Sequence, residues 1–194
     1  YALNQAPAGN EQTGNNFLGI FNGNSVSYAN TFGPITARVG YGFGEVAGDT
    51  SSSSTVSAGL TYVGPVTGSL SYQKVRGTGD AETQRVGVGL ALPFGAFTFK
   101  ALLSRSEGDD AGGIQVFKTD NHAVGLDYAW HAQNTANLSY YYGKDKLAGG
   151  GTTKTLVLSN DYALAKRTTL YAQAVYVDVG ANASIRTQIT GGLT

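Results

Sequence analysis

The 194-residue chain contains no cysteine and no methionine, and only 13% of its residues are charged. Without cysteine it has no disulfide framework, no cysteine zinc site, no iron–sulfur cluster and no thiol nucleophile. Its 13 basic residues equal its 13 acidic residues, so no strong net field attracts nucleic acid, and we expect no nucleic-acid partner. The absence of methionine from position 1 predicts a processed chain or a fragment.

Long apolar runs are also lacking. No window reaches the ~18 consecutive apolar residues of a membrane-spanning helix, which excludes a helical membrane protein. Outer-membrane barrels are not excluded, because their short strands alternate in polarity and have a mildly polar mean hydropathy. The mean hydropathy of this chain is −0.13.

The sequence instead alternates apolar and polar residues with a period of two, which predicts an all-β fold. We expect ten antiparallel strands, at 24–32, 35–45, 54–63, 66–76, 84–94, 97–107, 120–131, 136–144, 154–164 and 168–179. Their connections alternate between short turns such as Gly33-Pro34 and long polar loops such as 46–53, 77–83, 108–119 and 145–153. The pattern runs without a linker, so we predict a single barrel domain over 1–194 with its ten meander strands in 24–179.

One face of each predicted strand is apolar and the other is small or polar. In the fifth segment Val86, Val88 and Leu90 share one face, and Arg85 and Gly87 lie on the other. The polar faces carry too few charges for a solvent-exposed surface, which has about 25–35% charged residues. A water-filled lumen suits them better, so we predict a transmembrane barrel rather than a soluble barrel with an apolar interior.

The aromatic residues on the apolar faces of the predicted strands, which we call the apolar phase, gather near the strand ends. Two such belts, one at each membrane–water interface, are typical of proteins that span a bilayer. Near the short turns lie Phe32, Tyr62, Phe94, Phe97, Trp130 and Tyr162, and near the long loops lie Tyr41, Phe43, Tyr72, Tyr142 and Tyr176.

Charged residues of the polar phase are candidates for the lining of a pore. They are Arg38, Arg85, Lys100, Asp127 and Asp161. Arg38 and Lys100 lie nearest midspan in the predicted strands, so we expect them to form an electrostatic filter; the alternative is that each is a solvated side chain in a wide channel. Three basic residues against two acidic ones predict a slight preference for anions.

Basic residues of the apolar phase lie only beside the long loops. They are Lys74, Arg76, Arg105, Lys144 and Lys154. Cations at this level meet lipid phosphates, so we predict contacts with lipopolysaccharide. Ordinary snorkelling, or strand ends with a misjudged phase, is the alternative.

Three sequence strings resemble the general porins of Gram-negative bacteria, most closely the betaproteobacterial type. They are NSVSY (Asn24 to Tyr28), FGEVAGD (Phe43 to Asp49) and YALAKRTTLYA (Tyr162 to Ala172). The resemblance implies a sixteen-stranded homotrimeric barrel in the outer membrane, which lets small polar solutes and ions diffuse passively. A complete small barrel is the alternative.

Within this resemblance the ten segments look like strands six to fifteen, with the first strands and the last strand missing. Residues 1–23 then look like the end of the constriction loop, in which Glu11 would face the basic wall and Asn15 and Asn16 would keep the loop polar, and 180–194 look like the last extracellular loop.

Enzymatic activity finds little support in the sequence. His122 and His131 lie nine residues apart in opposite phase, so they cannot act together on a metal or a substrate. We expect no cofactor and no resident metal; weak calcium binding by Asp49, Asp80, Asp109 or Asp110 in the loops is the alternative to solvation. An adhesin or receptor surface is a further alternative, with loop 108–119 and its Ile114, Val116 and Phe117 as the best candidate.

Overall fold

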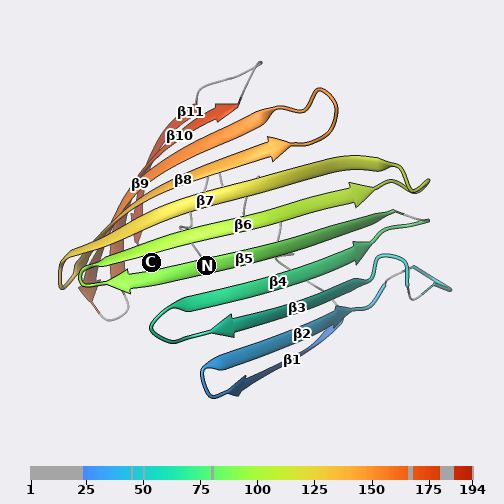
Figure 1. Ribbon diagram of the computed structural model, residues 1–194, viewed down its shortest axis with the longest axis horizontal. Helices are drawn as coiled ribbons and strands as arrows, with labels where there is room; N and C mark the ends of the chain where they lie inside the picture. The colour runs from blue at the N-terminus through green and yellow to red at the C-terminus, as the bar shows by residue number, and fades with distance from the viewer. Residues whose placement is uncertain are drawn as a thin grey trace.

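The computed structural model describes residues 24–44, 46–49, 51–79, 81–165, 168–179 and, for the backbone, 186–193. These residues form one antiparallel sheet of eleven strands, each paired with its neighbours in chain order (Figure 1). The strands are β1 Ser25–Phe32, β2 Ile35–Gly42, β3 Thr55–Tyr62, β4 Thr67–Arg76, β5 Glu82–Phe94, β6 Phe97–Asp109, β7 Gln115–His131, β8 Asn134–Asp145, β9 Thr152–Ala165, β10 Thr168–Val179 and β11 Arg186–Leu193. The described residues contain no helix that is long and apolar enough to cross a membrane.

Two of the short turns depend on glycine. Phe32 pairs with Ile35 and Phe94 pairs with Phe97, so each hairpin closes through two residues. Gly33 and Gly95 have φ values of +58° and +59°, in the left-handed region that glycine adopts without steric cost. Glycine at the first position of a two-residue turn matches the twist of the flanking strands, so the predicted turns at these sites form as expected.

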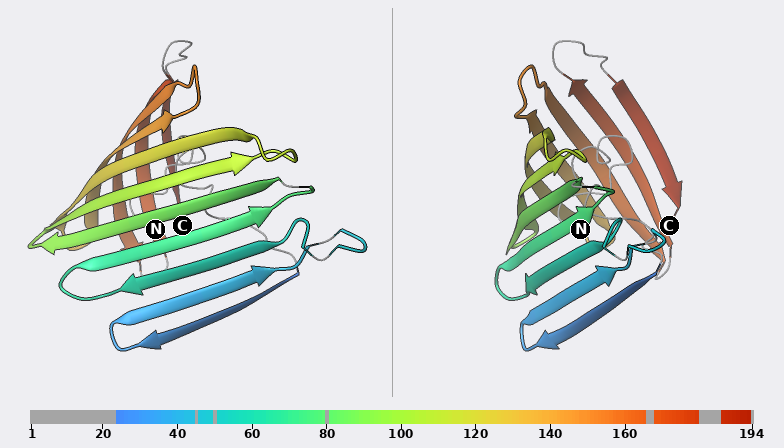
Figure 2. Two further views of the ribbon diagram at one scale, coloured as in Figure 1. Left: turned by 45° about the vertical axis from the view of Figure 1, so that its right-hand side comes forward. Right: turned by 90° about the vertical axis from the view of Figure 1, so that its right-hand side faces the viewer.

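The sheet curls into a trough with a concave and a convex side (Figure 2). The apolar phase is the more exposed one: on β8 the side chain of Leu138 is 47% exposed, whereas that of its neighbour Ser139 is 0% exposed. Because the concave side of a bare curved sheet is the less accessible one, the polar phase faces inward and the apolar phase outward. This orientation is the reverse of that in a soluble barrel and agrees with the predicted transmembrane barrel.

The hairpin of β6 and β7 extends further than its sequence indicates. The segment 108–119 was expected to be a long loop, but pairing continues to Asp109 and Gln115. Glu107 lies opposite Lys118 in the ladder, and their side chains form an ion pair of 3.1 Å. Charged residues in this strand extension therefore stabilise the ladder by cross-strand pairing, although their polarity resembles that of a loop.

Residues 186–193 correct a second expectation. They were assigned to an extracellular loop within 180–194, but they form β11, which pairs with β10 from Val177↔Arg186 to Leu170↔Leu193. The polar, glycine-containing sequence RTQITGGL hides the strand, because it offers few apolar residues to alternate with. The described sheet therefore has eleven strands instead of ten.

The connection between β2 and β3 is organised around a single carboxylate. Asp49 accepts hydrogen bonds from the hydroxyl and amide groups of both Ser51 and Ser52, at 2.5 to 3.2 Å. The hydroxyl of Ser51, then that of Ser52, and their backbone amides hold the pKa of Asp49 well below its usual range. These bonds give the serine-rich segment a defined turn.

An arginine on the convex face at midspan should destabilise the folded protein in lipid. Val88 lies at the middle of β5, opposite Leu70 and Leu103. We expect Val88→Arg to cost about 2–4 kcal/mol and Gln84→Arg, on the same face near the loop end, about 0–1 kcal/mol. Urea unfolding of the protein in lipid vesicles measures both. Equal losses would contradict lipid contact at midspan.

Candidate functional site

The inner wall of the sheet carries all five charges that were predicted to line a pore. Arg38 lies on β2 and pairs with Gly59 of β3, and Arg85 lies on β5 and pairs with Gln73 and Ser106. The other three are Lys100 on β6, Asp127 on β7 and Asp161 on β9. Each has the phase of the inward-facing residues, so the structure places the whole set on one side of the sheet.

Lys100 and Asp127 neutralise each other. The ammonium nitrogen of Lys100 lies 2.5 Å from Oδ2 of Asp127, and the amide of Asn137 donates to Oδ1 of the same carboxylate. Ser139 in turn donates to the carbonyl oxygen of Asn137 at 2.8 Å. Lys100, which was predicted to form an electrostatic filter with Arg38, is therefore paired with a carboxylate, and it lies near the short-turn end of β6.

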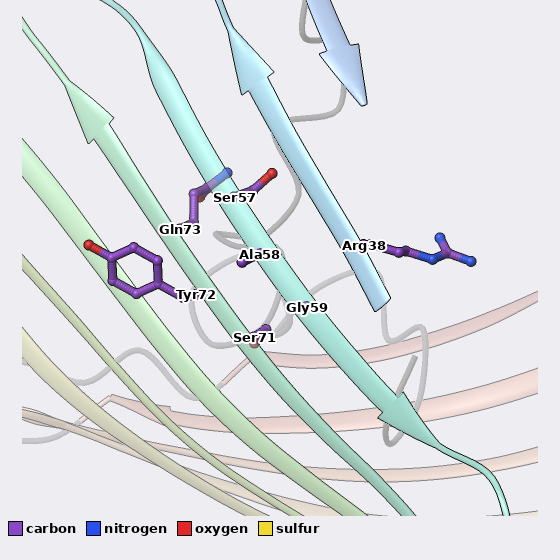
Figure 3. A pocket seen from close by; sticks show the side chains of 7 residues that line it. All are labelled: Arg38, Ser57, Ala58, Gly59, Ser71, Tyr72 and Gln73. Carbon is purple, nitrogen blue, oxygen red and sulfur yellow. The ribbon is translucent and has the colours of Figure 1, made fainter. Parts of the chain in front are cut away.

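Arg38 borders a hollow of about 270 Å³ on the inner wall of β2, β3 and β4. Its lining includes the small or polar side chains Ser57, Ser71 and Gln73 together with Gly59. Figure 3 shows the Arg38 side chain extending from β2 on the side opposite to the ring of Tyr72. Arg38 forms no ion pair within 4 Å with any described acidic residue, so its charge remains available to solutes.

Arg85 lies on the adjoining part of the same wall. Its Nη1 donates to Oε1 of Gln73 at 2.9 Å, and Gln73 also lines the hollow beside Arg38. Two guanidinium groups therefore border one region of small and polar residues, on the β2–β5 side. Asp161 and the neutral pair of Lys100 and Asp127 lie on the same face further along the strand order, on β9 and on β6 and β7.

Apolar residues on the inner wall are a feature that the sequence pattern missed. Ala123, Tyr141, Val157, Val175 and Val177 have the inward phase, are buried, and pack together with Leu102 at their margin. We refer to these six residues as the inner apolar patch. Its valines were masked in the sequence by their equally apolar outward neighbours, so the strands β9 and β10 show little alternation there.

The predicted lipopolysaccharide residues lie on the convex face at the loop end, and three of the five are already paired with carboxylates. Arg105 binds Asp120 through two hydrogen bonds of 2.6 and 3.1 Å. Lys74 lies 2.5 Å from Glu82, and Lys154 lies 4.0 Å from Asp178. Among the described residues, Arg76 and Lys144 have no acidic partner within 4 Å.

Of the eleven aromatic residues assigned to girdles, Tyr72 lies in the middle of β4 instead of near the long loops, and the other ten lie nearer to strand ends or just beyond them. All have the outward phase; Tyr142 and Tyr162 are partly exposed and the other nine are exposed. Phe97 stacks on Tyr128 with ring centroids 4.6 Å apart, and the indole nitrogen of Trp130 donates to Asn160 at 3.1 Å. Their role at a membrane interface stays a prediction.

The remaining predicted residues do not assemble a site. Glu11, Asn15, Asn16 and Asp80 lie outside the described residues. The described part of the chain contains no group of three or more metal-ligating side chains. Asp110 accepts hydrogen bonds from the amides of Gly112 and Ile114 in its own turn, as Asp49 does from the amide of Ser51 in the connection between β2 and β3. These carboxylates stabilise turns and are not gathered for calcium.

His122 and His131 lie at different levels of β7. His122 pairs with Leu103 and Tyr142 on the outward face, and His131 pairs with Asn134 at the short turn. Ile114, in the turn before β7, is 67% exposed; within β7, Val116 is exposed and Phe117 is partly buried. The two histidines do not lie together, and the role of Ile114, Val116 and Phe117 in an adhesin or receptor surface stays a prediction.

Known proteins similar to this chain share its architecture. The anion-selective porin from Comamonas acidovorans has 21% sequence identity and a TM-score of 0.73, with 87% of this chain and 54% of the porin covered. A loop L8 deletion mutant of OmpT, an outer membrane protein of Vibrio cholerae, has 16% identity and a TM-score of 0.74, and the match covers 86% of this chain and 61% of the mutant. OmpT of the same organism, folded in vitro and in its trimer form, has 15% identity and a TM-score of 0.71, and the match covers 87% of this chain and 61% of OmpT.

At these identities the likeness concerns the fold, and the chain spans between 54% and 61% of the length of these structures. No curated protein sequence is a significant match. A family model described as Gram-negative porin matches residues 2–182. With its apolar convex face, its polar inner wall and this match over most of its length, the chain belongs to the Gram-negative porin family and forms part of an outer-membrane β-barrel.

Proposed function

We propose that the protein is a passive diffusion channel for small hydrophilic solutes and ions, without enzymatic activity. The observation that carries this proposal is the inverted sheet, whose polar, partly charged wall faces the concave side and whose apolar wall faces outward. A lumen lined with serine, threonine, asparagine and glutamine keeps water and dissolved solutes in contact with hydrogen-bonding groups.

Charge selectivity in this channel comes from the unpaired wall residues. Arg38 and Arg85 carry positive charge on the β2–β5 side, and Asp161 carries negative charge on β9. The pair of Lys100 and Asp127 contributes no net charge. This balance favours anions weakly, in the same direction as the name of the anion-selective porin from Comamonas acidovorans.

The proposed assembly is a homotrimer of closed, sixteen-stranded barrels. Among the described strands β1 and β11 each pair on one side only, and lipid cannot satisfy the free backbone groups of an exposed edge. Further strands of the same barrel would pair with both edges. The similar OmpT structure is named as a trimer form, which supports three copies.

Lipopolysaccharide is the proposed lipid partner at the loop end of the convex face. Arg76 and Lys144 are the best candidates for phosphate contacts, because neither has an acidic partner within 4 Å among the described residues. Lys74, Arg105 and Lys154 share their charge with a carboxylate of the neighbouring strand and hold phosphate less strongly.

Recording from the purified protein in a planar bilayer tests the channel itself. We expect stepwise ohmic openings that arrive in groups of three, because a trimer inserts three pores together. A bilayer that stays silent with correctly folded protein would contradict the diffusion channel.

Neutralising the wall charges tests the paired arrangement. Arg38→Gln removes an unpaired cation, so the reversal potential should move toward cation selectivity by a few millivolts, far below the ~59 mV limit of a tenfold gradient. The double variant Lys100→Gln/Asp127→Asn removes a neutral pair and should leave the reversal potential unchanged. Lys100→Gln alone exposes Asp127 and should resemble Arg38→Gln. An unchanged potential in Lys100→Gln would argue that this pair does not border the ion path.

Lipopolysaccharide affinity tests the two unpaired cations of the convex face. Each surface cation contributes about 1 kcal/mol, so Arg76→Gln/Lys144→Gln should weaken binding on the order of thirtyfold. Arg38→Gln/Lys100→Gln is the control, because it removes two positive charges from the inner wall. Titration of the detergent-solubilised protein with lipopolysaccharide measures both. Equal affinity in the double variant and the wild type would rule out these contacts.

A further inference from the structure

The hollow beside Arg38 has a glycine at its centre. Gly59 of β3 lies opposite Arg38 of β2 in the ladder, and Ser71 of β4 lies opposite Gly59 on its other side. A Cβ added to Gly59 meets, among the described residues, only the carbonyl oxygen of Leu70 at 3.6 Å, which is an ordinary contact. The backbone therefore does not require glycine here, and the missing side chain leaves a space of about 270 Å³ open between its neighbours.

The polar side chains around this glycine can donate hydrogen bonds to a solute. The Arg38 guanidinium carries N–H donors and no acceptor, and it has no acidic partner within 4 Å among the described residues. The hydroxyls of Ser57 and Ser71 donate to backbone carbonyl oxygens at 3.5 and 3.4 Å. These distances exceed the ~2.5–3.0 Å of an ordinary O–H···O bond, so both hydroxyls remain available.

Gln73 completes the polar lining, and Arg85 determines which end of its amide is free. Nη1 of Arg85 donates to Oε1 of Gln73 at 2.9 Å, so the amide nitrogen of Gln73 remains as a donor. Figure 3 shows Gln73 beside Ser57, its partner in the ladder between β3 and β4. Arg85 also lacks an acidic partner within 4 Å among the described residues, so it adds positive potential to this part of the wall.

The size of the hollow favours a solute larger than a simple inorganic anion. At ~30 Å³ for each water molecule, it holds about nine waters. A guanidinium binds a carboxylate or phosphate through two parallel N–H···O bonds, so Arg38 can hold one anionic group. Hydroxyl groups on the rest of the solute reproduce the hydrogen bonds of the displaced waters, whereas an alkyl chain would lose them. The lining therefore suits an anion that carries several hydroxyls.

We propose that this hollow is a binding subsite for small hydroxylated anions, the class of sugar acids and sugar phosphates. The anionic group binds Arg38, and the hydroxyl groups of the solute bind Ser57, Ser71 and the amide nitrogen of Gln73. The inference rests on the proposed channel and deepens it, because it assigns a saturable site to a wall that otherwise acts through its net charge. The carboxylate and the phosphate share this chemistry, and separate probes distinguish them.

Calorimetric titration of the detergent-solubilised protein tests the subsite with four probes. Gluconate and glucose 6-phosphate carry both a negative charge and hydroxyls, hexanoate carries the charge without hydroxyls, and glucose carries hydroxyls without charge. We expect gluconate or glucose 6-phosphate to bind on the order of tenfold more tightly than hexanoate and glucose. The tighter of the two identifies the anionic group that Arg38 holds. Hexanoate that binds as tightly as both would overturn the subsite, because net charge alone would then explain the affinity.

Variants of the lining separate the two parts of the site. Ser57→Ala/Ser71→Ala removes only hydroxyls, so it should weaken binding of the hydroxylated anion roughly tenfold and leave hexanoate unchanged. Ser104→Ala, which removes a hydroxyl of the inner wall on β6, should change neither. Equal affinity for the hydroxylated anion in the double variant and the wild type would contradict recognition of its hydroxyls.

Gly59→Asp tests the anion position, because it places a carboxylate opposite Arg38 at a position with room for a side chain. It should weaken binding of the hydroxylated anion at least tenfold. Thr153→Asp adds the same charge to the inner phase of β9 and should leave binding near that of the wild type. If Gly59→Asp does not fold, Arg38→Gln makes the same test. Unchanged binding in the variant would overturn the subsite.

Single-channel recording distinguishes failure of the subsite from failure of the channel. A bound solute obstructs ions, so increasing concentrations of the hydroxylated anion should lower the current along a saturating curve in the wild type and not in Gly59→Asp. A conducting protein that binds none of the four probes would overturn the subsite and leave the channel intact. A protein that binds gluconate or glucose 6-phosphate but never conducts would instead contradict the proposed channel and support the subsite.

Discussion

The need to pair every backbone polar group where no water is present determines the form of this protein. In lipid an unpaired amide or carbonyl costs several kcal/mol, so a strand can cross only as part of a ladder that continues on both sides. The register of this sheet is nearly unbroken, with shifts at the ends of the β6–β7, β7–β8 and β9–β10 ladders. Once the ladder is formed, alternation of side chains decides which face meets lipid and which meets water.

The same geometry determines how the wall controls charge. Neighbouring strands bring inward side chains within about 5 Å of each other, so an acid and a base at paired or diagonal positions neutralise one another before a solute arrives. Lys100 and Asp127 do this on the inner wall, and Arg105 and Asp120 do it on the outer one. Counting charges by phase therefore overestimates the field in the lumen. Only the charges without a neighbouring partner of opposite sign act on a permeating ion, and on this wall they include Arg38.

Much of the fold follows from the period-two pattern, because alternation is imposed by the boundary between lipid and water. The hairpins at Gly33 and Gly95 and the outward face of β5 are predicted on that basis. Two features are not. Glu107 and Lys118 extend a hairpin beyond the apolar zone, where composition no longer distinguishes strand from loop. Val157 and Val175 face inward, where the pattern predicts polar residues. Both depend on cross-strand partners, and those are specified by register rather than by the local sequence.

The inward valines also explain why the two sides of the lumen differ. A wet wall gains nothing from Val157 and Val175, whereas burying them removes apolar surface from water at about 25 cal/mol per Å². Arg38, by contrast, is stabilised by exposure to water, because its charge stays hydrated there and available to solutes. The wall is apolar and buried at β8–β10 but polar and open at β2–β4, where Arg38 lies. The wall charges then act at short range, where water cannot screen them fully, so modest net charge is sufficient for selectivity.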